Sequence, residues 1–168
     1  MDIRSIQKPL KDRYRQEASA AFITLHAEGS TKDTPIACSV DIGRALLEAE
    51  AHKGVGGGGG ACSGDLLLGA LAACAQITCQ MVAAAMNITT NDIKIVVDGD
   101  LDLRGTLGFA DVPVGFSEIR LRIAIDAPEA DPAQLQSLFE KTEKYCVVLQ
   151  TLLSSTVVKS SMELTPTV

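Results

Sequence analysis

The sequence predicts an α+β fold, in which antiparallel sheets wrap around a buried central helix, and three features predict it. The run from Leu66 to Asn91 contains no charged residue and is rich in Ala and Leu, which form helices well. Asp92 to Leu103 and Phe116 to Ile125 alternate apolar and polar residues, as half-buried antiparallel strands do. Asp131-Pro132 is a strong helix start, since Asp caps and Pro suits the first helical position.

The central helix is expected from Ser63 to Met86. Ser63 is the predicted N-cap, and Asp65 places a negative charge in the first turn, where the helix dipole favours it. Asn87 is the predicted stop. A helix that is apolar nearly all round has to be buried on most of its sides. We therefore expect the rest of the chain to surround it.

A transmembrane span is the alternative for this run, because about 20 apolar residues are enough to cross a bilayer. Against a span, the run contains Gln76, Thr78 and Gln80, and many of its apolar residues are Ala. It also lacks flanking Lys/Arg clusters and an aromatic belt. These features favour the core helix of a globular domain, with no membrane partner.

Length and charge restrict the function classes. The 168 residues predict one domain, residues 1–168, with residues 1–17 as an N-terminal arm. The net charge of −6 and the absence of a basic run argue against nucleic acid as a partner. The first residues have no apolar signal core, and an odd number of cysteines, five, suggests reduced thiols. We expect a cytoplasmic protein.

The segment before the central helix predicts strands and a connector. Ala20 to Ala27 is an expected strand that ends in a turn at Glu28-Gly29-Ser30, and Pro35 to Ile42 is a second strand. Arg44 to His52 has a helix-forming composition, and its state stays open. Residues 54–60 are Gly-rich. They lack the Gly-Lys-Ser/Thr of a phosphate loop, so a flexible connector is favoured over a phosphate cradle.

After the central helix, the pattern predicts the remaining elements in order. The Asp92–Leu103 strand is expected to break at a turn or bulge at Asp98-Gly99-Asp100. The expected elements after it are a loop at Gly105–Gly115, the strand from Phe116, a helix from Asp131 to about Lys144, a short helix at Tyr145–Leu152 and a final strand at Thr156–Leu164.

Two cysteines are candidates for chemistry. Cys146 lies at the junction of two predicted helices, where an amide-rich helix start lowers a thiol pKa. Cys74 lies too deep in its helix to gain from the dipole, so it needs a cation, and Arg13, Arg15 and Arg44 are the candidates. Taken alone, each thiol is more often a buried apolar residue than a reactive one, because burial is a common role of cysteine.

Two segments of this sequence resemble the OsmC/Ohr family of thiol-dependent hydroperoxide reductases. The first is Ala61 to Cys74, ACSGDLLLGALAAC, similar to the family's acid–leucine–leucine–small–cysteine helix start. The second is Tyr145 to Leu152, YCVVLQTL, similar to the second-cysteine segment. Pro113-Val114-Gly115-Phe116 resembles one branch of the family.

The resemblance implies an OsmC-like fold, an interwoven homodimer with sites at its interface, and a reaction. Cys74 would be the peroxidatic thiolate for an organic hydroperoxide, and Cys146 the resolving thiol. A dithiol such as a lipoylated protein would reduce the resulting disulfide. The family also orients an arginine with a carboxylate; Asp65 matches the carboxylate, and Arg13 or Arg15 would be the arginine. No cofactor and no metal are expected.

The sequence departs from the family pattern at several places. Asp65 replaces the usual Glu, Val147 stands where the reductases tend to have Pro, and the early arginine lies in no recognisable strand motif. Asp65 and Cys74 are nine positions apart, or roughly 13 Å along one helix. A rival hypothesis is therefore a non-catalytic relative that binds a small apolar ligand. Cys79 is expected in the core, while Cys38 and Cys62 have no assigned partner.

Overall fold

The computed structural model describes residues 16, 28–31, 37–41, 46–55, 60–108, 111 and 113–163. The predicted arm and the Ala20–Ala27 strand lie outside these residues, apart from residue 16, as do residues 56–59 of the Gly-rich connector. The elements are, in chain order, β1 (Glu28–Thr31), β2 (Ala37–Asp41), β3 (Leu46–Glu50), the 3-10 helix η2 (Lys53–Val55), α2 (Ser63–Met86), β4 (Asp92–Leu101), α3 (Leu103–Leu107), β5 (Phe116–Asp126), α4 (Pro132–Tyr145) and α5 (Val147–Leu153).

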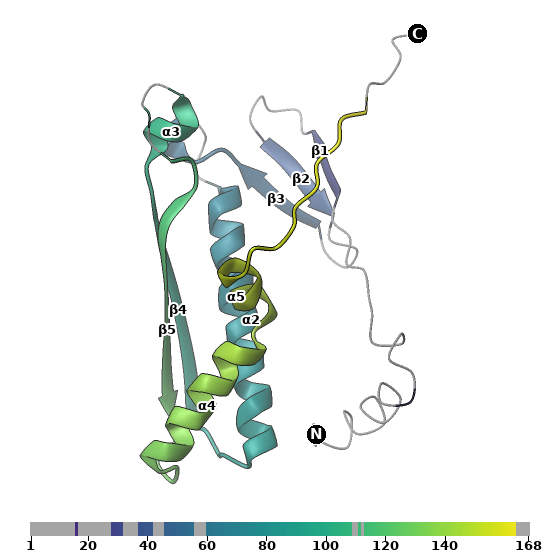
Figure 1. Cartoon of the computed structure of the whole chain (residues 1–168). Coiled ribbons are helices and arrows are strands. Elements are labelled where there is room, and N and C mark those ends of the chain that lie inside the picture. The colour runs from purple at the N-terminus through teal and green to yellow at the C-terminus, as the bar shows by residue number, and fades with distance from the viewer. Residues whose placement is uncertain are drawn as a thin grey trace.

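The long helix α2 lies along a two-stranded antiparallel hairpin made of β4 and β5, and both α4 and α5 pack against α2 (Figure 1). Strands β1, β2 and β3 form a separate antiparallel sheet. A bridge between Glu50 of β3 and Cys62 joins this sheet to the start of α2. The arrangement confirms the predicted α+β class with antiparallel sheets.

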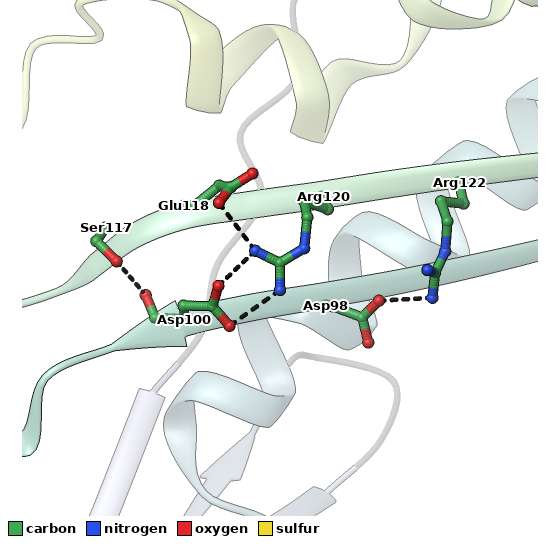
Figure 2. Close-up of polar contacts among 6 residues, drawn as sticks. All are labelled: Asp98, Asp100, Ser117, Glu118, Arg120 and Arg122. Atoms are coloured by element: carbon green, nitrogen blue, oxygen red, sulfur yellow. Dashed lines mark hydrogen bonds and ion pairs between the residues drawn. The ribbon is translucent and has the colours of Figure 1, made fainter.

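The β4–β5 hairpin has one apolar and one charged face. Opposite residues pair directly, as Ile95 does with Ile123 and Val97 with Leu121, and these side chains pack toward α2. The other face carries ion pairs (Figure 2). Arg120 binds both carboxylate oxygens of Asp100 and reaches Glu118, while Arg122 binds Asp98. The predicted alternation of β5 is confirmed.

Gly99 is a residue of the β4 strand and not of a turn. Of the two predicted interruptions at Asp98-Gly99-Asp100, the turn is absent, because pairing continues through Gly99. The other, a bulge, agrees with the register shift between Asp100 and Leu101. A Cβ atom at Gly99 would lie 2.6 Å from the Phe116 ring and 3.1 Å from Leu68. The glycine therefore permits a close approach of side chains to the strand.

The ends of α2 are capped by short-range hydrogen bonds. The N-cap is Cys62, one residue before the predicted Ser63, and the Asp65 carboxylate accepts a hydrogen bond from the Cys62 backbone N–H at 2.9 Å. Asn87 caps the other end, as predicted, with φ 54° in the left-handed region. Its N–H donates to the carbonyl of Ala84 at 3.2 Å. Asn tolerates this backbone conformation better than most residues.

Only one side of α2 is buried in the single chain. The residues that pack into the core are Leu71, Ala75, Cys79, Val82 and Ala83. On another side, Ile77 is 56% exposed and Met81 is 40% exposed. The prediction that the helix is buried on most sides is therefore wrong for one chain. Among the described helices, α2 has the length and composition to cross a membrane, a property that core helices of soluble proteins share.

A regular apolar row runs along this exposed side, and we call it the α2 stripe. Its members are Leu67, Ala70, Cys74, Ile77, Met81 and Ala84. All of them are exposed except Cys74, which is half-buried. Their spacing alternates three and four residues, which is the repeat with which two helices pack along a common seam. Except at Cys74, the stripe is an exposed apolar surface in the described part of the single chain.

Three further predictions are wrong, one before α2, one at α3 and one after α5. Glu28-Gly29-Ser30 is part of strand β1, because it pairs with β2, and is not a turn. The predicted loop from Gly105 begins inside the short helix α3. Thr156 to Glu163 forms no strand, and Val157 and Val158 are 79% and 86% exposed. An isolated strand has no hydrogen-bonding partner, so this segment cannot form one alone.

Other predictions are confirmed. Pro35–Ile42 contains β2. The sequence left the state of Arg44–His52 open, and in the structure this stretch contains strand β3 in spite of its helix-forming composition. The α4 helix starts with Asp131 as N-cap, whose side chain accepts a hydrogen bond from the Gln134 N–H at 2.8 Å. The predicted short helix is α5, and Cys79 is fully buried.

A substitution at Leu138 of α4 tests whether α4, α2 and the hairpin share the core described above. It is fully buried, and it packs with Cys79, Val82 and Ile93. We expect Leu138→Ala to lower the free energy of unfolding by about 2–5 kcal/mol, because it leaves a cavity. Leu107→Ala is the control, since Leu107 is 51% exposed and its loss should cost far less. Chemical denaturation measures both, and equal losses would contradict the assigned core.

Candidate functional site

Cys74 lies between the buried and exposed sides of α2. It follows the start of the helix at Ser63 by eleven residues, so the side chain projects from the middle of the helix. It is half-buried and packs against a cluster formed by Leu71, Ala75 and Cys146. The apolar face of the hairpin closes the cluster on one side, through Ile95, Val97, Ile119 and Leu121. The thiol is thus held in apolar surroundings at the edge of the core.

Cys146 lies where one helix ends and the next begins. It is the C-cap of α4 and the N-cap of α5, with an extended backbone conformation (φ −72°, ψ 105°). Its N–H donates to the carbonyl of Thr142 at 3.0 Å, and its own carbonyl accepts from Gln150 at 2.9 Å. Cys146 is therefore hydrogen bonded to the last turn of α4 through its N–H and to the first turn of α5 through its carbonyl. The Cys146 side chain is fully buried.

The structure brings these two cysteines together across 72 positions of sequence, since both belong to one buried cluster and each thiol acts on the pKa of the other. Both are free thiols. Thiols that approach this closely can be joined by a disulfide when the backbone geometry allows it. The predicted juxtaposition is present, while the catalytic roles of the two residues stay predictions.

Hydrogen-bond donors at the start of α5 favour the thiolate of Cys74. Burial alone raises the pKa of the Cys74 thiol, because a charge is poorly solvated there. Hydrogen bonds from the backbone N–H of Val148, the thiol of Cys146, the hydroxyl of Thr78 and the N–H of Val147 outweigh burial. The net result is a pKa below the ordinary value of a cysteine. Cys74 is therefore the thiol of the pair that ionises first.

Cys146 is shifted in the opposite direction. Burial raises the pKa of the Cys146 thiol, and the nearby sulfur of Cys74 raises it further. The N–H groups of Leu149 and Val148 only partly offset these effects. The two pKa values are thus shifted apart, so that Cys74 gives up its proton more readily than Cys146 does. This division matches a nucleophile next to a thiol that reacts second.

Asp65 lies at the start of α2 and is engaged with Cys62. The Cys62 backbone N–H donates to the carboxylate, and this amide together with the nearby Cys62 thiol holds the pKa of Asp65 below its usual value. His52 contributes a smaller favourable charge. The structure therefore gives Asp65 a helix-capping role, and within one chain it does not bring this carboxylate to Cys74.

Among the arginines whose side chains the structure describes, none acts on the Cys74 thiol. The candidates Arg13, Arg15 and Arg44 lie outside the described residues. Arg120 and Arg122 are held by Asp100, Glu118 and Asp98 on the face of the hairpin turned away from the α2 core (Figure 2). The groups that lower the pKa of Cys74 are instead amide, thiol and hydroxyl donors.

Three of these donors were missed by the sequence reasoning. The Val147 and Val148 donors are backbone groups, so no side-chain pattern identifies them. The predicted helix start after Cys146 was a signal, but its amides were assigned to the pKa of Cys146 and not to that of Cys74. Thr78 could have been found from its position four residues after Cys74, because such residues are neighbours on a helix.

A separate cavity of about 520 Å³ lies at the start of α2. Most of its lining is apolar, including Val55, Leu67, Leu101 and Phe116, and His52 and Cys62 are among its polar groups. Neither Cys74 nor Cys146 lines it. Its size suits a small ligand, because ligand pockets span about 300–1,000 Å³.

Val147→Pro tests the amide contribution to Cys74. Proline has no N–H, so the change removes one donor and should raise the pKa of the Cys74 thiol. Val147 is the first residue of α5, a position that accepts proline, so the fold should be kept. We expect slower alkylation of Cys74 at neutral pH, measured by peptide mass spectrometry. Val147→Ala keeps the N–H and is the control; an equal effect of both variants would contradict the amide's role.

The comparisons with known proteins place the chain in a family. The model of the OsmC-like protein family matches residues 56–161, more than half of the chain. No curated protein matches the sequence. Among solved structures, an OsmC-like protein from Mycoplasma pneumoniae has 22% sequence identity and a TM-score of 0.66, with 79% of this chain and 89% of that chain covered.

Two other structures with the same fold are organic hydroperoxide resistance proteins. The protein from Elizabethkingia anophelis has 18% identity and a TM-score of 0.59, over 80% of this chain and 91% of that chain. OhrB of Bacillus subtilis has 18% identity and a TM-score of 0.53, over 80% and 94%. At these identities the likeness establishes the fold alone. With the match of the family model over most of the described core, this protein belongs to the OsmC-like family.

Proposed function

We propose that this protein reduces organic hydroperoxides, with Cys74 as the peroxidatic and Cys146 as the resolving cysteine. The observation that carries the proposal is the contact of two free thiols whose pKa values are shifted in opposite directions. A lowered pKa supplies thiolate, the nucleophilic form, on the Cys74 side. The raised pKa of Cys146 makes it the weaker competitor for the peroxide, so this sulfur is left for the second step.

The proposed reaction balances in three steps. The Cys74 thiolate attacks the distal oxygen of ROOH; the O–O bond breaks, ROH leaves after taking up a proton, and Cys74 becomes a sulfenic acid. The Cys146 thiol then attacks the sulfenic sulfur, which releases water and forms the Cys74–Cys146 disulfide. A dithiol, free or carried as a lipoyl group on a protein, reduces this disulfide and is itself oxidised.

The surroundings of Cys74 suit an apolar peroxide. Leu71, Ala75, Val97 and Leu121 contribute no charge to the buried side of the thiol. The stripe residues Ala70 and Ile77 flank Cys74 on the exposed side and are also apolar. Such a site favours an alkyl or aryl hydroperoxide over hydrogen peroxide, because burial of the organic group is favourable.

A peroxide-consumption assay with tert-butyl or cumene hydroperoxide and an excess of a dithiol tests the function. We expect Cys74→Ser to abolish turnover, while Cys146→Ser still consumes about one equivalent through the first step. Cys79→Ser is the matched control, since Cys79 is a buried thiol of the same helix outside the Cys74 cluster, and it should keep turnover. Equal activity of wild type, Cys74→Ser and Cys146→Ser would refute the assignment.

We further propose that the protein is a homodimer whose subunits meet at the α2 stripe. Ile77 and Met81 are large apolar residues left exposed by a single chain, and the spacing of the stripe suits helix–helix packing. Because Cys74 belongs to the stripe, a partner helix would cover the exposed side of the thiol. That position also allows the partner to supply a cation that the described residues do not.

Ile77→Asp tests the proposed interface. A carboxylate in the centre of the stripe would be desolvated by the partner helix, so we expect the variant to be monomeric at a concentration where the wild type is dimeric. Leu107→Asp is the control, because Leu107 is an equally exposed apolar residue on α3, outside the stripe. Analytical ultracentrifugation measures both. A monomeric wild type, or an unchanged dimer of Ile77→Asp, would contradict the interface.

A second candidate function is the binding of a small apolar ligand without peroxide turnover. The observation in its favour is the 520 Å³ cavity at the start of α2, which is lined by apolar side chains and lies apart from Cys74. Saturable binding of an apolar fluorescent probe that Leu67→Trp abolishes, together with no peroxide consumption, would favour this function over the first. In either case we expect a cytoplasmic location, where thiols stay reduced.

A further inference from the structure

Phe116 lies on the α2 side of the hairpin, although regular alternation of β5 predicts the opposite side. Counting back from Ile119, which packs toward α2, alternation would turn Ser117 to the same side and Phe116 to the charged side. The strand pairing skips Ser117, however, and Phe116 lies opposite Leu101. The Ser117 hydroxyl donates to the carbonyl of Asp100 at 3.0 Å. Ser117 is thus the extra residue of a β-bulge, and the bulge turns Phe116 toward α2.

Two glycines leave the space that the Phe116 ring occupies. A Cβ atom at Gly99 of β4 would lie 2.6 Å from the ring, and a Cβ atom at Gly64 of α2 would lie 3.3 Å from it. A side chain at Gly99 would therefore displace the ring, and one at Gly64 would crowd it. The ring is held between the start of α2 and β4, where it forms one wall of the 520 Å³ cavity.

The cavity is formed by segments that are distant in the sequence, and its walls carry little charge. The start of α2 contributes Leu67, the stretch after β3 contributes His52 and Val55, and the ends of β4 and β5 contribute Leu101 and Phe116. Among the described residues that line the cavity, none is Asp, Glu, Lys or Arg. A charged ligand would lose its hydration here without gaining a counter-charge. The cavity therefore favours a neutral ligand.

His52 supplies a hydrogen-bond donor of fixed polarity at this cavity. Its Nδ1 accepts a hydrogen bond from the backbone N–H of Gly54 at 3.0 Å. A ring nitrogen that accepts carries no proton, so the neutral imidazole has its proton on Nε2. The hydroxyls of Ser63 and Thr106 also line the cavity, but a hydroxyl can rotate to donate or to accept. The Nε2–H group of His52 can only donate, so it selects a ligand that has an acceptor.

We propose that this cavity binds a neutral, mostly apolar molecule with one carbonyl oxygen, which accepts a hydrogen bond from His52 while the hydrocarbon part packs against Phe116. His52 is exposed as well as part of the lining, so the carbonyl lies toward the mouth of the cavity. Pockets for small molecules commonly combine apolar walls with a few placed polar groups in this way. The inference rests on the second candidate function and deepens it, and it does not require chemistry at Cys74, which does not line the cavity.

Displacement of the fluorescent probe Prodan, a neutral aromatic ketone, tests the site in the full chain. Two competitors of nearly the same shape are compared: acetylnaphthalene, which has a carbonyl, and ethylnaphthalene, which has none. We expect His52→Phe to weaken the binding of acetylnaphthalene roughly three- to tenfold, the effect of one lost hydrogen bond, and to change that of ethylnaphthalene by less than about twofold. Phe116→Leu should weaken the binding of both competitors, because both lose contact with the aromatic ring.

Ile77→Asp is the control for binding elsewhere, since Ile77 lies on the exposed α2 stripe and does not line the cavity. It should leave the displacement of Prodan unchanged, and a loss of binding in this variant would overturn the proposal by placing the probe on the stripe. Equal effects of His52→Phe on the two competitors would overturn the proposal and leave the second candidate function standing. Failure of Prodan to bind the wild type would refute both. Peroxide consumption is measured separately, so failure of the first proposed function is distinguishable from either result.

Discussion

The short break between α4 and α5 at Cys146 is the feature on which the site depends. At this residue one helix ends and another begins, so the unpaired amides of the new helix start are available to a neighbouring group. The same break directs the Cys146 thiol toward α2. The helix break at Cys146 therefore places two things beside Cys74: the N–H donors that stabilise its thiolate and the thiol that can react with it.

The residue at position 147 decides how many backbone N–H donors this break offers to Cys74. A proline at this position would leave one amide fewer. In this chain the Val147 N–H is present and acts on Cys74 together with that of Val148. Stabilisation by neutral donors is weaker than stabilisation by a nearby cation, but it depends on geometry that the helix junction fixes. The described part of the chain thus lowers the pKa of Cys74 without a charged side chain.

The α2 helix has two apolar sides, one buried in the chain and one exposed. One side has to pack on the hairpin and on α4, and residues such as Leu71 and Cys79 are fully buried there. The other side presents the α2 stripe, which is equally apolar but exposed in one chain. Cys74 lies on the boundary between the two sides, where a thiol is shielded from water and still accessible. A reactive sulfur in a fully buried position such as that of Cys79 would have no route for a substrate.

The sequence alone determined the elements whose signals are local. The caps at Asp131 and Asn87, the alternation of β5 and the length of α2 follow from side-chain chemistry within a few residues, and the structure has them. The two cysteine segments also identified the family before any coordinates. The strand at Glu28–Thr31 and the absence of a strand after Thr156 were not predicted, because pairing with another strand decides both.

Only the tertiary structure decided which groups meet at the site. It placed Asp65 with Cys62 at the start of α2. It also showed that the amides after Cys146 act on Cys74, through Val147 and Val148, as well as on Cys146 itself. It also left one side of α2 exposed, although its composition is apolar all round. The physical reason is the same in each case. Composition and spacing fix what a segment can do, whereas hydrogen bonds and burial depend on which segments distant in sequence are packed against it.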